Sequence, residues 1–133
     1  MKKHLLAAAI VVAIVTAAPL AQTKVSITSP VDGSSVGERP VVEGMVGDPK
    51  ATVWVVVHPL EISDYWVQPR LSVRETGSWK VQINIGRPGR IDVGKLFEIR
   101  AVANPKMDLR EGLVLDRWPE SAAMSELVEV TRK

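Results

Sequence analysis

The chain has 133 residues, with 17 Lys and Arg against 15 Asp and Glu, no Cys, and 46% hydrophobic residues. This length suits one domain, and a charged fraction of 24% is ordinary for a globular protein, which argues against wholesale disorder. The absence of Cys excludes a disulfide framework, a thiolate nucleophile and a zinc site built on sulfur.

The N-terminal segment, residues 1–21, has the pattern of a secretory signal peptide. Two lysines precede an uninterrupted apolar run over residues 5–15, and small residues end the segment. A charged start, a short apolar stretch and a small-residue end are typical of such a signal. Pro19 lies where a cleavage site usually has a small residue, so an uncleaved membrane anchor formed by residues 5–21 is the alternative.

Cleavage after residue 21 would change the charge balance of the protein. The two lysines leave with the segment, and residues 22–133 then carry equal numbers of basic and acidic residues, 15 of each. Such a domain lacks the basic balance that is typical of general nucleic-acid binding. We therefore expect an exported domain, periplasmic or extracellular, that binds no nucleic acid and meets a membrane only if the first segment is retained.

Apolar and polar residues alternate with a period of two along residues 22–133, and turn residues separate the runs. The run at 51–58 is apolar on both faces, as expected of a central strand. Only residues 119–124, with the sequence PESAAM, are compatible with a helical turn. In chain order, the predicted strands are residues 25–28, 41–46, 51–58, 70–74, 79–85, 97–103 and 128–130.

Seven short strands without a long amphipathic helix predict an all-β fold, namely an immunoglobulin-like antiparallel β-sandwich of about seven strands, preceded by the N-terminal signal or anchor helix. Trp79, Ile83, Phe97 and Ile99 lie on the apolar sides of their strands, so we expect them to fill the interior. Trp54 is also predicted to be buried, because valines flank it on both sides.

Motifs spread over nearly all of this domain resemble those of bacterial immunoglobulin-like domains. In order, they correspond to an S-P-x-D/N-G opening, a G-x-W-x-V strand and a final V-x-V-T strand. The resemblance implies an immunoglobulin-like or fibronectin III-like fold in an exported protein. It leaves the function open, because such domains serve adhesion, spacing, carbohydrate binding and assembly. The matching residues are ITSPVDGS at 27–34, VEG at 42–44, ATVWV at 51–55, GSWKV at 77–81 and VEVT at 128–131.

Two connections, residues 59–69 and 104–125, are longer than a minimal module of this kind needs, and long connections are often functional. Both are apolar enough that we expect them to be packed. If residues 65–73 form one edge strand, the connections 59–69 and 86–95 lie at the same end of the sandwich as residues 30–40. Tyr65 and Trp66 would then lie near Arg87, Arg90 and Lys95.

This end combines aromatic rings, which stack on sugars or apolar groups, with guanidinium groups, which bind carboxylate or phosphate. The combination suits an acidic polysaccharide or an acidic patch on another envelope or extracellular protein. Structural interpretations stay open beside it: the aromatic pair covers a sheet edge, Trp118 fills an open end of the sandwich, and residues 87–90 form a solvated turn. The predicted binding residues are Tyr65, Trp66, Gln68, Arg87, Arg90 and Trp118.

Catalysis and metal binding are not supported by the sequence. His58 lies near Ser63 and the carboxylates of Glu61 and Asp64, but no G-x-S-x-G, H-E-x-x-H or phosphate-binding glycine loop surrounds them. The same two carboxylates share the predicted end with Asp32, without the D-x-D-x-D-G run of a calcium loop. We expect no enzyme, no cofactor and no metal.

The sequence therefore favours an exported, non-catalytic interaction module that binds an envelope partner protein or a polysaccharide. The alternative is a purely structural or assembly subunit that pairs through a sheet edge or through the 104–125 loop.

Overall fold

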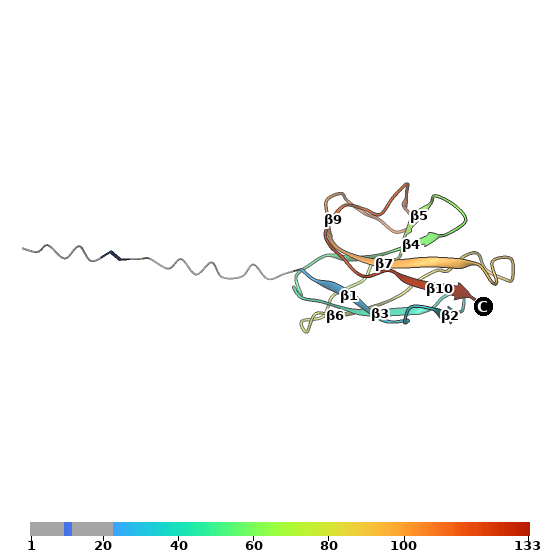
Figure 1. Cartoon of the computed structure of the whole chain (residues 1–133), viewed down its shortest axis with the longest axis horizontal. Coiled ribbons are helices and arrows are strands. Elements are labelled where there is room, and N and C mark those ends of the chain that lie inside the picture. Colours follow the sequence, from blue (N-terminus) through green and yellow to red (C-terminus); the bar gives the residue numbers. More distant parts are fainter. Residues whose placement is uncertain (1–9, 12–22) are drawn as a thin grey trace, which may run out of the picture.

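The computed structural model describes residues 10–11 and 23–133 of the chain (Figure 1). Most of the predicted signal or anchor lies outside the described residues. Within them, no helix has the length and apolar character needed to cross a membrane. The strands are β1 (Val25–Ser29), β2 (Ser34–Val36), β3 (Val41–Val46), β4 (Val53–Pro59), β5 (Tyr65–Val67), β6 (Ser78–Gln82), β7 (Leu96–Pro105), β8 (Val114–Leu115), β9 (Ser121–Met124) and β10 (Val128–Arg132).

These strands form two sheets of unequal width. The narrow sheet has the order β1-β3-β6, and the wide sheet has the order β2-β10-β7-β4-β5-β8, with β9 also paired to β7. Every pairing is antiparallel except that of β2 with β10. The two layers are visible in Figure 1, with β1, β3 and β6 below and β4 and β7 above. The predicted all-β, sandwich-like fold is confirmed for the described residues.

The main core lies between the two sheets. Trp79, Ile83, Phe97 and Ile99 are each at most 3% exposed, so the prediction that they fill the interior is confirmed. Burial of each such side chain contributes about 1.5–3 kcal/mol. Gly44 lies opposite Trp79 in the β3–β6 pair, and a Cβ at this position would collide with the indole, so the glycine makes room for the ring.

A second, smaller cluster covers the outer face of the wide sheet. Trp54 is buried as predicted, but it belongs to this outer cluster and not to the space between the sheets. The 104–125 connection folds over this face, so it is packed, as predicted. The buried residues are Trp54, Val56, Val67 and Val102, and the half-buried residues that cover them are Tyr65, Leu109, Leu113, Leu115 and Trp118.

Two of the predicted elements are wrong. Residues 70–74 are not a strand, so the predicted edge strand over residues 65–73 stops early, at the end of β5. Leu71 and Val73 nevertheless pack against the main core, which explains the alternation that suggested a strand. Residues 119–124 contain the strand β9, not a helical turn. A single turn of helix gains little by itself, whereas pairing with β7 satisfies the main chain of β9.

Candidate functional site

The unequal width of the sheets leaves part of the wide sheet uncovered. Trp66 in β5 pairs with Val57 in β4, and directly opposed residues point to the same face of a sheet. Val57 belongs to the core between the sheets, so Trp66 lies on the inner face as well. Val57 is only 2% exposed, whereas Trp66 is 40% exposed. The narrow sheet ends at β6, and the inner face of β5 lies beyond it.

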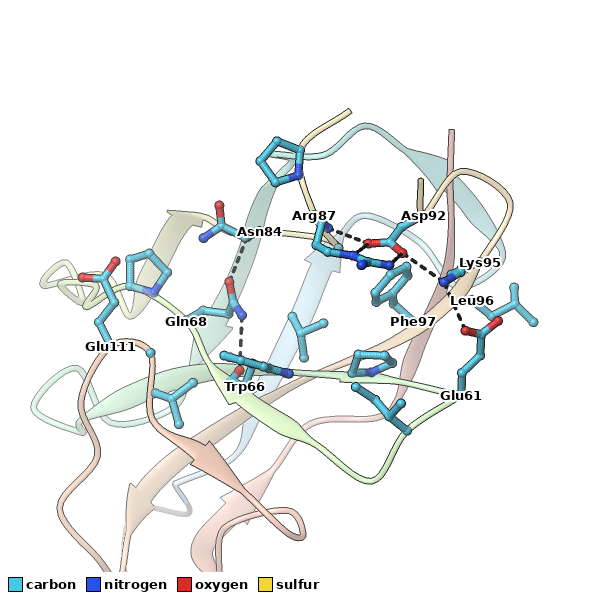
Figure 2. Close-up of a pocket in the computed structure, with 18 residues that line it drawn as sticks. Glu61, Trp66, Gln68, Asn84, Arg87, Asp92, Lys95, Leu96, Phe97 and Glu111 are labelled. Carbon is cyan, nitrogen blue, oxygen red and sulfur yellow. Dashed lines mark hydrogen bonds and ion pairs between the residues drawn. The ribbon is translucent and has the colours of Figure 1, made fainter. Parts of the chain in front are cut away.

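A groove of about 580 Å³ occupies this uncovered region, and we refer to it as the β5 groove (Figure 2). Its volume lies within the range of about 300–1,000 Å³ that is usual for ligand sites. Val57 and Phe97 give it a buried apolar lining, while Trp66 and Leu96 add exposed apolar surface; Val67, whose side chain belongs to the outer cluster, also borders it. The other lining residues are Pro59, Glu61, Ile62, Gln68, Pro69, Asn84, Gly86, Arg87, Pro88, Asp92, Lys95, Glu111 and Gly112.

A buried amide, that of Gln68, joins two walls of the β5 groove. Gln68 is 5% exposed. Its Oε1 accepts a hydrogen bond from the main-chain N–H of Asn84 at 2.8 Å, and its Nε2 donates to the carbonyl of Trp66 at 3.2 Å. Both ends of the amide therefore have partners, as a buried polar group requires. Figure 2 shows this bridge between β5 and the chain that follows β6.

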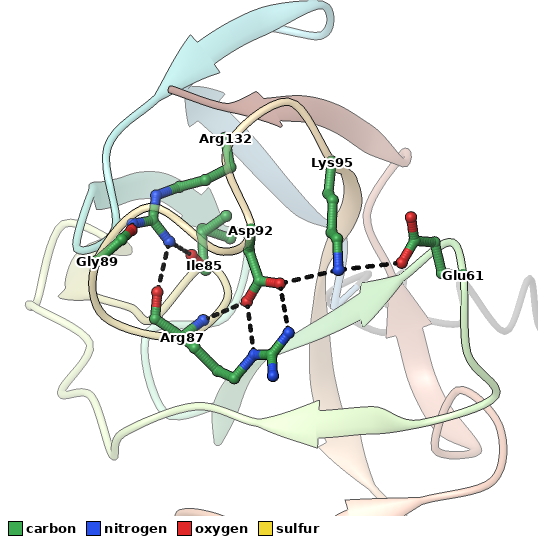
Figure 3. A network of polar contacts seen from close by, with 7 residues as sticks. All are labelled: Glu61, Ile85, Arg87, Gly89, Asp92, Lys95 and Arg132. Carbon is green, nitrogen blue, oxygen red and sulfur yellow. Dashed lines mark hydrogen bonds and ion pairs between the residues drawn. The ribbon is translucent and has the colours of Figure 1, made fainter.

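An ion-pair network fixes the loop 86–95 at one end of the groove (Figure 3). The buried carboxylate of Asp92 accepts hydrogen bonds from Arg87 through its main-chain N–H at 2.7 Å, its Nε at 3.2 Å and its Nη2 at 3.0 Å. Lys95 Nζ lies 3.1 Å from Asp92 and 3.3 Å from Glu61. Two cations thus share two carboxylates.

These contacts shift the pKa values of the groups that make them. The side-chain hydrogen bonds from Arg87, followed by its main-chain N–H and by Lys95, hold the pKa of Asp92 well below its usual range. The same hydrogen bonds with Asp92 raise the pKa of Arg87 and of Lys95. Both basic groups are therefore charged and already neutralised by their neighbours.

Arg132, near the end of the chain, fixes the same loop from behind. Its side chain is 3% exposed, and its Nη1 donates to the carbonyls of Ile85 at 2.8 Å and Arg87 at 2.9 Å. Its Nη2 donates to the carbonyl of Gly89 at 2.5 Å and pairs with Glu38 at 3.2 Å. One guanidinium group thus holds three main-chain carbonyls, so this wall of the β5 groove is formed before any ligand arrives.

The structure brings together some of the predicted binding residues and separates others. Trp66, Gln68 and Arg87 line the β5 groove. Arg90 is exposed in the same loop but is not among the lining residues. Tyr65 and Trp118 lie on the outer face of the wide sheet, where their ring centroids are 4.8 Å apart.

The outer aromatic cluster, formed by His58, Tyr65 and Trp118, determines the surroundings of the His58 imidazole. His58 stacks on Tyr65 with ring centroids 4.0 Å apart, and its Nδ1 lies 3.0 Å from the carbonyl of Asp64. Its Nε2 faces Glu98 at 3.9 Å and has no contact with Ser63 among those described. Within residues 10–11 and 23–133, no three His, Asp or Glu side chains converge as metal ligands.

Sequence reasoning missed Asn84, Asp92 and Glu111 as groove residues. Asp92 lies between Arg90 and Lys95 in a turn-rich loop. An acidic residue with basic neighbours in such a loop indicates an ion pair within the loop. Glu111 lies in the 104–125 connection, and no sequence pattern predicts that this connection lies beside β5. In the structure this connection turns back along β5: Gly112 N–H donates to the Val67 carbonyl at 2.9 Å, and β8 pairs with β5.

No protein-family model and no curated protein matches this sequence. One chain of a solved structure, described as "Structural basis of T cell specificity and activation by the bacterial superantigen toxic shock syndrome toxin-1", is similar in shape, with a TM-score of 0.44 and 8% sequence identity. The alignment covers 82% of this chain and 98% of that chain. A likeness at this level does not indicate a shared function.

Proposed function

We propose that this chain is an exported, non-catalytic interaction module that binds a partner protein through the β5 groove. The observation that carries the proposal is the exposure of Trp66 on the inner face of the wide sheet, above a buried apolar lining. A concave apolar site with a few fixed polar groups is the usual form of a binding site. Trp is also enriched among the residues that dominate binding energy.

We further propose that the sandwich is immunoglobulin-like. In that fold the first, second and fifth strands share one sheet, and the third, sixth and seventh share the other. Here β1, β3 and β6 of the narrow sheet correspond to the first, second and fifth strands. In the wide sheet, β4, β7 and β10 correspond to the third, sixth and seventh, which supports this assignment. β5 and β8 then extend the wide sheet beyond β4, as additional strands do in variable-type domains.

A partner protein is favoured over an acidic polysaccharide as the ligand. Binding of an acidic polysaccharide needs cations that are free to pair with its carboxylates. Arg87 and Lys95, the two basic residues that line the groove, are instead engaged by Asp92 and Glu61. The apolar lining provides area for apolar side chains, which proteins offer more readily than charged sugars do.

The export of the domain is proposed from the pattern of residues 1–21 and fits the position of the groove. The chain enters the sandwich at β1. Lys24, just before β1, accepts a hydrogen bond at its carbonyl from the main-chain N–H of Gly47, which lies in the connection that leads into β4. The groove lies at the opposite end of β4, since Pro59 and its pairing partner Phe97 both line it. A domain retained by its N-terminal segment would thus present the groove away from the membrane.

The proposal is tested by capturing partners from an envelope extract with the full chain and then titrating each purified partner against it. We expect Trp66→Ala to weaken binding at least tenfold, because it removes the main exposed ring of the groove. Tyr65→Phe is the matched control, since it keeps its ring on the outer face and should bind normally. Equal affinity of the Trp66→Ala chain would refute the proposal. The N-terminus of the exported protein, determined by sequencing, distinguishes a cleaved signal from an anchor.

The second candidate function is that of an assembly subunit. Met107, Val114 and Met124, from the 104–125 connection and its strands, are between 40% and 46% exposed. Exposed apolar side chains of this kind favour pairing between copies or with another subunit. Sedimentation equilibrium at low micromolar concentration would show a concentration-dependent oligomer if this function holds and a monomer if it does not.

A further inference from the structure

The charges that line the β5 groove do not balance. Its charged residues are Glu61, Arg87, Asp92, Lys95 and Glu111. The first four form the shared ion-pair network. Glu111 is exposed, and among the described residues no hydrogen bond or ion pair engages its carboxylate. Figure 2 shows Glu111 across the groove from Lys95 and Glu61. The uncompensated charge of the groove is therefore one negative charge, near Glu111.

The wall of the groove that follows β6 also offers an unpaired main-chain acceptor. The N–H groups of Ile83 and Ile85 donate to Pro40 and Glu38 on one side of the chain. In an extended chain the main-chain groups of the residue between them point to the opposite side. The Asn84 N–H does so and donates to Gln68, while no hydrogen bond to the Asn84 carbonyl is found within residues 23–133.

Resting on the proposed function, we infer that the β5 groove binds an extended segment of the partner protein in which an apolar residue adjoins a Lys or Arg. The apolar side chain packs on Trp66 and Phe97 and excludes water from the groove. A main-chain N–H of the segment donates to the Asn84 carbonyl. The basic side chain lies beside Glu111, the one groove carboxylate that no cation of the chain compensates.

An acidic ligand is disfavoured because the groove carries one uncompensated negative charge. A carboxylate beside Glu111 would be repelled, and it could bind Arg87 or Lys95 only by displacing Asp92 or Glu61. An exposed ion pair changes affinity modestly, by about twofold to fivefold. The charge therefore selects among segments, while the apolar contact supplies most of the affinity.

Three acetylated tetrapeptide amides test this inference: Leu-Ser-Leu-Lys, Leu-Ser-Leu-Gln and Leu-Ser-Leu-Glu. Each is titrated into the full chain while NMR follows the indole N–H signal of Trp66, which a Trp66→Phe variant assigns. We expect the Lys peptide to bind about twofold to fivefold more tightly than the Gln peptide, and the Glu peptide to bind most weakly. Raising the salt concentration to about 1 M should remove the difference.

Two variants of the chain locate the charge that selects the peptide. Glu111→Gln should abolish the preference for the Lys peptide over the Gln peptide. Glu75→Gln is the matched control, because Glu75 is exposed in the turn before β6 and is not a groove residue. This variant should keep the preference. A preference that survives in the Glu111→Gln chain would overturn the assignment to Glu111.

Failure of the inference is distinguishable from failure of the proposed function. Equal binding of the three peptides, or tighter binding of the Glu peptide or of an oligogalacturonate, would overturn the inference while the groove remains a binding site. The inference also falls if no peptide shifts the Trp66 signal although a captured partner does. If neither the peptides nor any captured partner shifts that signal, the proposed function fails as well.

Discussion

Tyr65 and Trp66 are neighbours in one three-residue strand, yet the structure gives them different surroundings. Tyr65 points to the outer face, where it stacks on His58 and meets the edge of Trp118. Trp66 points to the inner face and is 40% exposed in the β5 groove. The sequence pair that suggested one aromatic site therefore contributes to two regions, the outer aromatic cluster and the β5 groove.

The difference follows from what covers each face of the wide sheet. The outer face is covered by the chain's own 104–125 connection, so aromatic rings there complete a small core. The inner face is covered by a sheet of only three strands, which does not extend over β5. Trp66, which lies beyond the narrow sheet, therefore remains exposed, and ion pairs and main-chain hydrogen bonds hold its surroundings in place. Substitutions should therefore separate stability from binding.

The largest effect on stability is expected for Trp118→Ala. This ring packs on Tyr65, and Arg100 lies over it with its guanidinium carbon 5.0 Å from the ring centroid. Its removal opens the outer cluster and should lower the free energy of unfolding by about 3 kcal/mol. Urea denaturation measures the loss, and binding through the β5 groove should persist under native conditions. A loss of binding without a loss of stability would contradict the separation of the two regions.

Arg132→Met should lower the free energy of unfolding by about 2 kcal/mol, because it leaves the carbonyls of Ile85, Arg87 and Gly89 without their common donor. Hydrogen exchange should show faster opening of the 85–94 amides, with the outer aromatic cluster unaffected. Binding should also weaken, since the wall of the groove is no longer fixed. Unchanged exchange in this loop would show that Arg132 does not hold it.

Asp92 should make the groove end of the molecule sensitive to acid. The pKa of Asp92 is lowered in the folded state from its ordinary value of 3.8, so its contribution to stability is complete above that pH and declines as the pH falls below it. Urea denaturation of the wild-type and Asp92→Asn chains between pH 7 and pH 2 measures this contribution. We expect the gap between the two chains to narrow below about pH 4, as the linkage requires. A gap that stays constant over this range would contradict the ion-pair assignment.

Trp66→Ala should have the smallest effect on stability, under about 1 kcal/mol, because the ring is 40% exposed. The same variant should have the largest effect on binding. Thermal unfolding and partner titration of one preparation give both values. A loss of stability as large as that of Trp118→Ala would show that Trp66 serves the core, not a binding site.

Much of the fold could be predicted because long alternating runs report which side chains are buried. Trp79 and Ile83 on one run, and Phe97 and Ile99 on another, occupy the interior as expected. The short strands β2, β8 and β9 could not be predicted in this way, since two to four residues carry too little alternation. At 119–124 the local preference for a helical turn was overridden by pairing with β7.

The candidate site could be predicted only in part. The period of two already implies that Tyr65 and Trp66 face opposite sides of their strand, so the sequence held the signal that separates them. Burial of Gln68 and the pairing of Arg87 with Asp92 depend on the path of two loops, and no alternating pattern of apolar and polar residues predicts that path. The position of Glu111 depends on the 104–125 connection turning back along β5.

The most direct test of the account is hydroxyl-radical footprinting of the four tryptophans, with mass spectrometry, in the free chain and with a captured partner. The account predicts that Trp66 is oxidised fastest in the free chain, well ahead of Trp54 and Trp79, which are 5% and 3% exposed. The partner should then protect Trp66 and leave Trp118 unchanged. Protection of Trp118 with continued oxidation of Trp66 in the complex would contradict it.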